Sequence, residues 1–320
     1  MRDPLSTEYP IAQLRYAYAR AAARDRDFAV AAEVLEQTLE IDVGWAAAWF
    51  ALGEARQQLG DFVAARAAFA EALRLDPEDH QGASLRLAAI EGRQVGTLPR
   101  AYVARLFDDY APRFNAHLTG DLFYHGPAVL YDAVRRLAPG RRFRRALDLG
   151  CGTGLAGAAF RALVDDLSGV DLSPAMIEEA RQAGVYDALA VGDAVDFLAA
   201  TPAAGADLIL AADVFVYLGE LAPALNAARC ALAPDGLLAF TLESEPGSTF
   251  GLGETLRFRH SHAYLSRALD EAGLTVLTLE LASSRREAGV EVPGLAVLVG
   301  HGGGKFGPYA SAVTNASTSV

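Results

Sequence analysis

The sequence predicts an all-α helical-repeat domain followed by an α/β domain built on a mostly parallel sheet. Residues 18–43 and 52–77 align at an offset of 34 residues, the period of a helix-turn-helix repeat. Beyond residue 140, apolar runs of strand length alternate with segments of helical spacing. That alternation is typical of a parallel sheet covered by helices on both faces.

Size and composition set the class of protein. The chain has 320 residues, is 52% hydrophobic and carries a formal charge of −12, so we expect two domains and no generic nucleic-acid binding. No apolar run reaches the ~18 residues of a membrane span, and the first ten residues lack an apolar signal core. We therefore expect a cytoplasmic protein without membrane contact. Cys151 and Cys230 have no metal-like spacing, which predicts reduced thiols and no metal site.

The first domain is predicted over residues 1–95. Its second repeat resembles the tetratricopeptide repeat family at Trp49, Leu52, Gly53, Ala65, Phe69, Ala72 and Pro77. The first repeat departs from that pattern, with Arg15 and Val43 at the positions that match Trp49 and Pro77. Residues 80–91 are expected to form a helix that caps the stack. The resemblance implies a concave surface for a protein partner, and a helical lid or a dimerisation piece is the alternative.

The second domain is predicted over residues 141–301, after a helical linker at 96–140. Its expected strands are 145–150, 167–172, 188–191, 206–213, 237–243, 274–280 and 295–300. Helical segments separate the first five strands, whereas a short polar loop joins the last two. Because that loop has no room for a crossover helix, the last two strands should pair antiparallel. Residues 302–320, rich in Gly, Ser and Thr, are predicted to be a flexible tail.

A glycine-rich turn, LDLGCGTG at 147–154, follows the first of these strands. The dinucleotide fingerprint needs a third glycine where this chain has Leu155, so a nicotinamide-dependent oxidoreductase is disfavoured. The turn instead resembles motif I of class I S-adenosylmethionine-dependent methyltransferases, a resemblance that extends over residues 105–300. It implies a Rossmann-like fold of seven strands. A tight bend without a ligand is the alternative.

The resemblance assigns roles around this turn. Asp148 suits the amino group of the methionine moiety, and the glycines let the backbone approach a nucleoside. Asp171, 21 residues after Gly150, is expected to accept hydrogen bonds from the ribose hydroxyls. The implied cofactor-binding residues are Tyr110, Asp148, Gly150, Cys151, Gly152, Gly154, Asp171, Leu172, Met176, Asp193, Ala194, Ala211 and Asp213.

Several of these residues have a second interpretation. The resemblance implies that Leu172 and Met176 pack on the adenine ring, but Met176 also suits a protein core. Asp193 is implied to bond the adenine amino group beside the N–H of Ala194, but it also suits a helix N-cap. Ala211 is expected to line the methionine portion of the cofactor, with Asp213 nearest the methyl group.

The stretch 106–127 carries more aromatic and histidine residues than a linker needs. The resemblance implies a flap over the cofactor, with Tyr110 near its carboxylate. Further members of the expected wall are Phe107, Phe114, His117 and Tyr124. An amphipathic docking helix is the alternative. The segment FDDYAPRF resembles the flap of carboxyl methyltransferases that act on acyl thioesters.

The acceptor side is less specified, because positioning alone supplies much of the rate of methyl transfer. The candidate catalytic residues are His260, as a general base, with Tyr217 and Tyr124. We expect His260 on a loop at 251–265. The candidate substrate-binding residues are His117, Arg257, Arg259 and Arg285. Solvated loop charges, an exposed loop histidine and simple packing of Tyr217 are the alternatives.

Together these patterns predict an enzyme that moves a methyl group from S-adenosylmethionine to an O-, N- or S-nucleophile of a small molecule or peptide. A carboxylate acceptor is included among these. The alternative is a binding module whose repeats recruit a protein that the second domain methylates, or whose second domain senses the cofactor. A run of six arginines between 135 and 145 is interpreted as a solvated surface, because it lies at the sheet edge opposite the expected ligand crevice.

Overall fold

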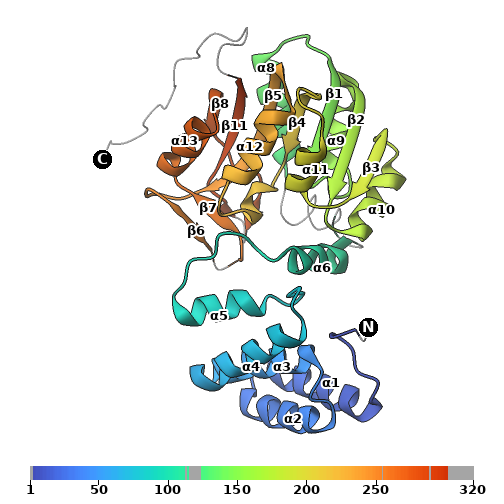
Figure 1. Ribbon diagram of the computed structural model, residues 1–320, viewed down its shortest axis with the longest axis vertical. Coiled ribbons are helices and arrows are strands. Elements are labelled where there is room, and N and C mark those ends of the chain that lie inside the picture. The colour runs from blue at the N-terminus through green and yellow to red at the C-terminus, as the bar shows by residue number, and fades with distance from the viewer. Residues whose placement is uncertain (1–2, 112–113, 115–123, 254, 288–289, 302–320) are drawn as a thin grey trace. The chain divides into compact units, whose positions relative to one another are not determined.

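The computed structural model describes residues 3–111, 114, 124–253, 255–287 and 290–301 (Figure 1). The chain divides into two compact units, and the division lies between Val103 and Ala104. It falls inside helix α6 (Arg100–Tyr110), so this helix belongs to both units.

The first unit is a set of paired helices. Its elements are α1 (Pro10–Arg24), α2 (Phe28–Ile41), α3 (Ala46–Gln58), α4 (Phe62–Leu75) and α5 (Ala83–Glu91). The aligned residues Asp27 and Asp61 play the same part, because each accepts a hydrogen bond at the start of its helix, from Val30 N and Ala64 N respectively. This equivalence supports the predicted repeat.

Close helix packing in the second repeat depends on Gly53. A Cβ at Gly53 would lie 2.6 Å from the fully buried ring of Phe69, so no larger residue fits without movement. The small residue on α3 therefore allows the aromatic residue of α4 to fill the space between the two helices.

The second unit contains the predicted sheet. The main strands are β1 (Phe143–Leu149), β2 (Val164–Asp171), β3 (Ala188–Val191), β4 (Ala206–Ala211), β5 (Leu232–Ser244), β8 (Leu274–Leu281) and β11 (Gly294–His301). Their order is β3-β2-β1-β4-β5-β11-β8. The first five strands are parallel, and β11 runs antiparallel to both β5 and β8. The predicted mostly parallel sheet with an antiparallel final pair is confirmed.

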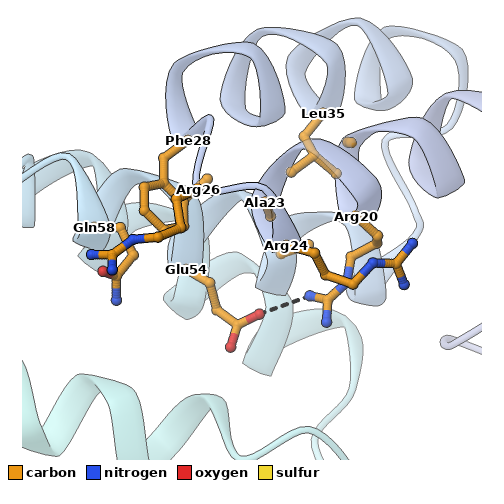
Figure 2. A pocket seen from close by; sticks show the side chains of 11 residues that line it. Arg20, Ala23, Arg24, Arg26, Phe28, Leu35, Glu54 and Gln58 are labelled. Atoms are coloured by element: carbon orange, nitrogen blue, oxygen red, sulfur yellow. Dashed lines mark hydrogen bonds and ion pairs between the residues drawn. The ribbon is translucent and has the colours of Figure 1, made fainter.

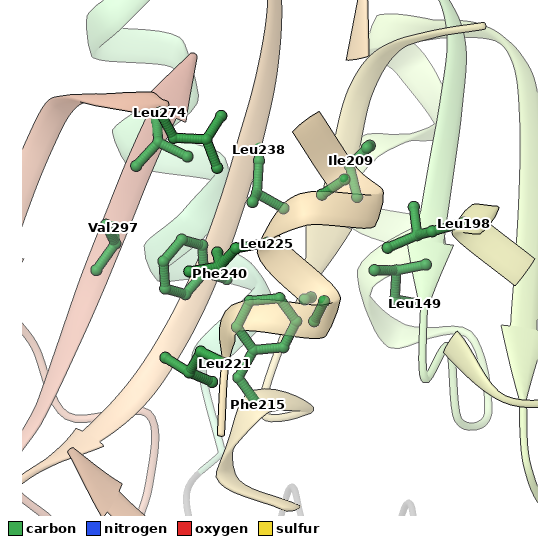
Figure 3. Packing of buried hydrophobic residues seen from close by; sticks show 14 of the residues in the cluster. Leu149, Leu198, Ile209, Phe215, Leu221, Leu225, Leu238, Phe240, Leu274 and Val297 are labelled. Carbon is green, nitrogen blue, oxygen red and sulfur yellow. The ribbon is translucent and has the colours of Figure 1, made fainter. Parts of the chain in front are cut away.

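Helices cover both faces of this sheet (Figure 1). They are α8 (Gly126–Leu137), α9 (Leu155–Phe160), α10 (Pro174–Ala183), α11 (Ala194–Ala200), α12 (Ala222–Ala231) and α13 (His262–Glu271). Along β5, Leu238 and Phe240 join one apolar cluster with residues of α12 and α13 (Figure 3), whereas Leu237 and Ala239 join a second cluster with residues of α8. Because alternate residues enter different cores, residues 237–240 of this strand are all apolar.

The segment 251–265 differs from the expected loop. It contains β6 (Phe250–Leu252) and β7 (Phe258–His260), which pair antiparallel, and β7 also pairs parallel with the end of β5. Phe258 and His260 are buried while Arg259 between them is half-buried, and this alternation is the strand signal that the sequence interpretation missed. A smaller pair, β9 (Arg286–Glu287) and β10 (Val290–Glu291), lies between β8 and β11.

The predicted arginine surface has acidic neighbours. Four of its members form ion pairs, which are Arg136–Glu280, Arg142–Asp165, Arg144–Asp207 and Arg145–Asp166. In the part of the chain that the structure describes, no helix has the length and apolarity needed to cross a membrane. The same residues include no group of three or more His, Cys, Asp or Glu side chains placed to hold a metal ion.

Candidate cofactor and acceptor site

The glycine turn joins the end of β1 to the start of α9. Gly150 has φ +56° and Gly152 has φ +53°, both in the left-handed region that favours glycine. A Cβ at Gly150 would also lie 2.6 Å from Cγ2 of Val214, which follows β4. The turn therefore requires glycine at Gly150, and its backbone at Gly152 also favours glycine.

Asp171, at the end of β2, is joined to that turn. Its Oδ2 accepts a hydrogen bond from Gly152 N at 2.9 Å, and its Oδ1 accepts one from Ser173 N at 2.9 Å. Burial raises the pKa of Asp171, and these backbone hydrogen bonds partly offset that rise. Two elements predicted to contact the cofactor are thus brought together. Cys151, between the turn glycines, is buried and donates its N–H to Val170 O.

Asp108 was not among the predicted site residues, and it belongs to the same region. Its Oδ1 accepts hydrogen bonds from Ser173 Oγ at 2.5 Å and from Ala175 N at 3.1 Å, at the first turn of α10. Ser173 Oγ in turn accepts from Met176 N, so it is the predicted N-cap. Nothing in the local sequence distinguishes Asp108 from its exposed neighbour Asp109.

Asp148 contacts a partner that the sequence did not suggest. Its Oδ2 accepts a hydrogen bond from the Tyr186 hydroxyl at 2.7 Å, and its side chain is almost completely buried. Burial raises the pKa of Asp148 to about 7. The Tyr186 ring crosses β2 at Gly169, where a Cβ would lie 3.0 Å from it. The sequence signal for this contact was the presence of Gly169 and Gly157 in otherwise apolar elements, because glycine leaves room for the Tyr186 ring.

The residues predicted near the adenine are ordered by the protein itself. Met176 is fully buried on α10, and Leu172 is half-buried. Asp193 Oδ1 accepts hydrogen bonds from Val195 N and Asp196 N at the start of α11, whose first residue is Ala194. Core packing for Met176 and capping for Asp193 are therefore both present. The Met176 side chain has no exposed surface, so the structure shows it as core packing.

An ion-pair cluster lies at the carboxyl ends of β4 and β5. Asp213, beyond the buried Ala211, has φ +59°, and its Oδ2 lies 3.0 Å from Arg257 Nη2 and 3.6 Å from Arg285 Nη1. Thr241 Oγ1 donates to Asp213 Oδ1 and accepts from Asp213 N. These hydrogen bonds offset the backbone strain of an aspartate with a left-handed φ angle.

Glu243 of β5 is the second acid of this cluster. Its Oε1 accepts from Arg257 Nε at 2.5 Å and lies 2.8 Å from Arg285 Nη1, while Arg259 Nε is 3.6 Å from Oε2. Oε2 is buried and accepts no hydrogen bond from the described residues. Among those residues the cluster joins three arginines to two carboxylates, and the Arg259 side chain keeps 44% exposure. Arg257, Arg259 and Arg285, predicted separately, are thus assembled together.

Aromatic side chains gather beside the cluster. Phe107 of α6 packs edge-to-face on Tyr217 at 5.4 Å between ring centroids, and Phe114 contacts both Phe107 and Tyr110. Tyr217 accepts a hydrogen bond from Arg257 Nη1. Phe114 would lie 3.7 Å from a Cβ at Gly152, so the predicted wall extends to the glycine turn.

Tyr124 belongs to the same electrostatic environment. Burial raises the pKa of Tyr124, and the charge of Asp213 raises it further while Arg257 lowers it. The tyrosine hydroxyl is therefore neutral at physiological pH and suited to hydrogen bonding. His117, the other member of the expected wall, lies outside the described residues.

His260 does not lie on an exposed loop. Its side chain is fully buried in β7, where Nε2 is 3.0 Å from Gly219 O and the ring stacks on Tyr264. Burial lowers the pKa of His260 to about 4. A general base must reach the proton it removes, and this packing gives the imidazole no such access. The geometry does not support the catalytic role predicted for His260.

Comparison with known proteins agrees with the fold and the glycine turn. Residues 147–238 match the family model described as a methyltransferase domain, and residues 46–79 match a tetratricopeptide repeat. The crystal structure of Burkholderia thailandensis 1,6-didemethyltoxoflavin-N1-methyltransferase has a TM-score of 0.50 at 17% identity, covering 65% of this chain and 93% of that one. This structural likeness shows the fold.

Two curated relatives are more similar in sequence. Malonyl-[acyl-carrier protein] O-methyltransferase of Enterobacter lignolyticus is 31% identical over 156 residues, which are 47% of this chain and 61% of the relative. Trans-aconitate 2-methyltransferase of Methylobacterium radiotolerans is 41% identical over 98 residues, 30% of this chain and 36% of the relative. The matched region thus spans less than two thirds of either relative.

The second unit thus contains a region, residues 147–238, that matches a methyltransferase domain, and its mostly parallel sheet has a Rossmann-like order. The chain joins this domain to an N-terminal tetratricopeptide segment, as the sequence resemblance implied.

Proposed function

We propose that this protein transfers a methyl group from S-adenosylmethionine to a nucleophile of a small molecule or peptide, and that the acceptor atom is a carboxylate oxygen. One observation carries the proposal of a cofactor site. Asp171 at the end of β2 is hydrogen-bonded to Gly152 of the turn, so an acid and a bare backbone meet at the carboxyl edge of the sheet, where open α/β sheets bind ligands.

The residues at this edge fit the cofactor. Each oxygen of Asp171 accepts one backbone hydrogen bond and retains a further lone pair for a ribose hydroxyl. The left-handed glycines leave room beside the turn. Leu172 follows β2, and Asp193 and Ala194 follow β3, so these three residues flank the position that an adenine ring across β2 and β3 would occupy.

When bound, the cofactor supplies a methyl group on a cationic sulfonium. The protein's own residues then act by position. Asp213 offers a carboxylate near the cationic sulfonium, and Phe107, Tyr110 and Phe114 exclude water. Tyr124 and Tyr217 orient the acceptor through neutral hydroxyls. Alignment of this kind supplies much of the barrier reduction, so no general base is required.

The charge of the ion-pair cluster supports an anionic acceptor. Its arginines exceed its carboxylates by one in the described part of the chain, and Arg259 is the most exposed and most loosely paired of them. Arginine binds carboxylates through paired N–H donors. The acceptors named for the two curated relatives, a malonyl thioester and trans-aconitate, both contain carboxylates.

The test has two stages. Isothermal titration should give binding of S-adenosylmethionine and of its demethylated product but not of NAD. Incubation with methyl-labelled cofactor and a panel of dicarboxylates, acyl thioesters, phenols and amines should then label the carboxylates. Methyl esters release labelled methanol in mild base, whereas ethers and N-methyl products do not. Labelling confined to base-stable products would contradict the carboxylate proposal, and absence of cofactor binding would contradict the enzyme proposal.

A further inference from the structure

An exposed apolar stripe runs along α1, the first helix of the helical-repeat unit. Ile11, Leu14 and Tyr18 are 62%, 72% and 61% exposed, and their spacing of three and four residues places them on one face of the helix. A second face of α1, which includes the fully buried Ala12 and Ala19, packs inside the unit. The helix is therefore apolar on two faces, and the stripe is the one left exposed to solvent.

The second repeat shows what covers this stripe elsewhere in the unit. The 34-residue offset aligns it with a stripe of α3 formed by Trp45, Ala48 and Leu52. These three residues are buried, and they share one apolar cluster with residues of α1 and α2, the helices of the preceding repeat. Residues 3–9, which come before α1, contain no helix that could take this part. Within the described residues, the stripe of α1 is thus a stacking face without a partner.

The opposite end of the unit is closed. Ala83 and Leu87 of α5 share an apolar cluster with Phe69 and Ala72 of α4, so α5 is the cap that a terminal repeat needs. At the α1 end the corresponding surface is apolar. A soluble repeat unit hides such a surface in a contact.

We propose that the stripe packs on the same stripe of a second copy of this chain, with the two α1 helices antiparallel about a two-fold axis close to Leu14. A contact of this kind is isologous, so one self-complementary patch serves both copies. It involves the helical-repeat unit alone and does not depend on the proposed methyltransferase activity.

The charges of α1 favour this partner and this direction. Glu8 lies just before the helix and Arg24 lies in its last turn, and both are exposed. Arg20, nearer the centre, already pairs with Glu54 at 2.9 Å (Figure 2). Antiparallel packing brings the acidic end of each helix to the basic end of the other, where Glu8 faces Arg24 and the helix dipoles are also complementary.

The size of the stripe fits a reversible dimer. Its three large side chains expose roughly 400 Å² together, which is within the ~300–600 Å² of the largest apolar patch on a typical monomer. Each partner of a stable complex buries about 800 Å². The contact is therefore weak, and dimerisation should depend on protein concentration.

Sedimentation velocity of the full chain tests the proposal. The fraction of dimer should rise as the protein concentration increases from about 5 to 500 μM. Leu14→Asp should weaken dimerisation at least about ten-fold, because it places two like charges together at the two-fold axis. The matched control is Val63→Asp on α4, since Val63 is 84% exposed and lies outside the stripe. Both substituted positions are exposed, so both variants should melt at the temperature of the parent.

A charge exchange tests the direction of packing. Glu8→Arg and Arg24→Glu should each weaken dimerisation about three-fold, and the double variant should restore it because the pair forms again with its signs reversed. A double variant weaker than either single variant would overturn the antiparallel arrangement. A chain that stays monomeric at about 500 μM would show that a different protein covers the stripe and would overturn the proposal. Dimerisation unchanged in Leu14→Asp, or weakened equally in Val63→Asp, would overturn it as well.

Discussion

Asp108 and Ser173, 65 residues apart, are joined by a 2.5 Å hydrogen bond from the serine hydroxyl to the aspartate carboxylate. Ser173 caps the helix that follows the proposed ribose ligand Asp171, and Asp108 belongs to the helix that carries Phe107 and Tyr110. The bond therefore ties the aromatic wall to the proposed cofactor-binding strand end. The Asp108 charge also raises the pKa of Asp171.

Asp108→Ala should reduce affinity for S-adenosylmethionine about five-fold. The variant loses an interaction of the kind made by helix caps, which contributes about 1 kcal/mol, and it releases α6 from α10. Isothermal titration measures the effect. Asp109→Ala is the matched control, because the Asp109 side chain is 76% exposed. Equal losses of cofactor affinity in Asp108→Ala and Asp109→Ala would show that the Asp108 hydrogen bonds do not support cofactor binding.

Asp171→Ala should reduce cofactor affinity by roughly ten- to one-hundred-fold, since hydrogen bonds to a charged group contribute about 1.5–3 kcal/mol. Asp171→Asn retains one acceptor oxygen and should lose less. Asp165→Asn serves as the control on the opposite end of the same strand, where the side chain is 56% exposed. Retained affinity in Asp171→Ala would contradict the ribose assignment.

The sequence predicted the local structure of the candidate site where its residues lie close together in the chain. The glycine turn, Asp171 and Ser173 lie in short patterns that fix local backbone, so strand, turn and cap could be predicted together. Asp108 and Tyr186 escaped prediction because their partners are distant in sequence and the bonds exist only after the sheet has formed. His260 was misplaced for a related reason. The pairing of β7 with β5, which buries it, is a tertiary event that a single three-residue alternation barely indicates.

The ion-pair cluster should separate acceptor recognition from stability. Arg259→Gln removes the half-exposed arginine, so we expect a KM for a carboxylate acceptor about five- to ten-fold higher, with cofactor affinity unchanged. Arg257→Gln should instead destabilise the fold by about 3 kcal/mol, because it leaves Asp213 and Glu243 buried with one cation fewer. Steady-state kinetics and urea unfolding distinguish these outcomes.

Arg136→Gln, at the surface where Arg136 pairs with Glu280, is the control for both measurements and should change neither. An unaltered KM in Arg259→Gln would remove this residue from the acceptor site.

Asp148 should make the protein more stable in mild acid than in mild base. Its pKa is about 7 in the folded state and 3.8 ordinarily, so between these values the folded protein binds a proton that the unfolded chain does not. The contribution of Asp148 to the free energy of unfolding is fully present below about pH 4 and is lost as the pH rises through 7. Its full size is about 4 kcal/mol. Asp148→Asn keeps an acceptor for Tyr186 and removes the charge.

Urea unfolding of Asp148→Asn should therefore show a gain of stability over the parent at pH 8 and little difference at pH 4. Tyr186→Phe is the complementary variant. It removes the hydrogen bond that lowers the pKa of Asp148, so the loss of stability should start at the same pH as in the parent and continue to a higher pH. A parent and an Asp148→Asn variant with the same pH profile would show that Asp148 does not titrate in this range.

His260 should change protein stability with pH in the direction opposite to Asp148, over an overlapping pH range. Its pKa falls from 6.5 to about 4 on folding, so between these values the unfolded chain binds a proton that the folded protein does not. Stability from this group is complete above about pH 6.5 and is lost as the pH falls towards 4, by about 3 kcal/mol in total. The two buried groups thus partly cancel in the parent protein, and only single variants reveal either one.

His260→Gln should remove the acid-side loss, because a neutral amide can still donate to Gly219 O and does not titrate. Urea unfolding at pH 7 and at pH 5 measures this change, and the stability of the variant relative to the parent should rise from pH 7 to pH 5. The exposed neighbour His262 provides the control, because His262→Gln should follow the parent profile. If His260→Gln kept the parent profile but abolished methyl transfer with cofactor binding intact, the imidazole would be catalytic, and the assignment of a purely structural histidine would be wrong.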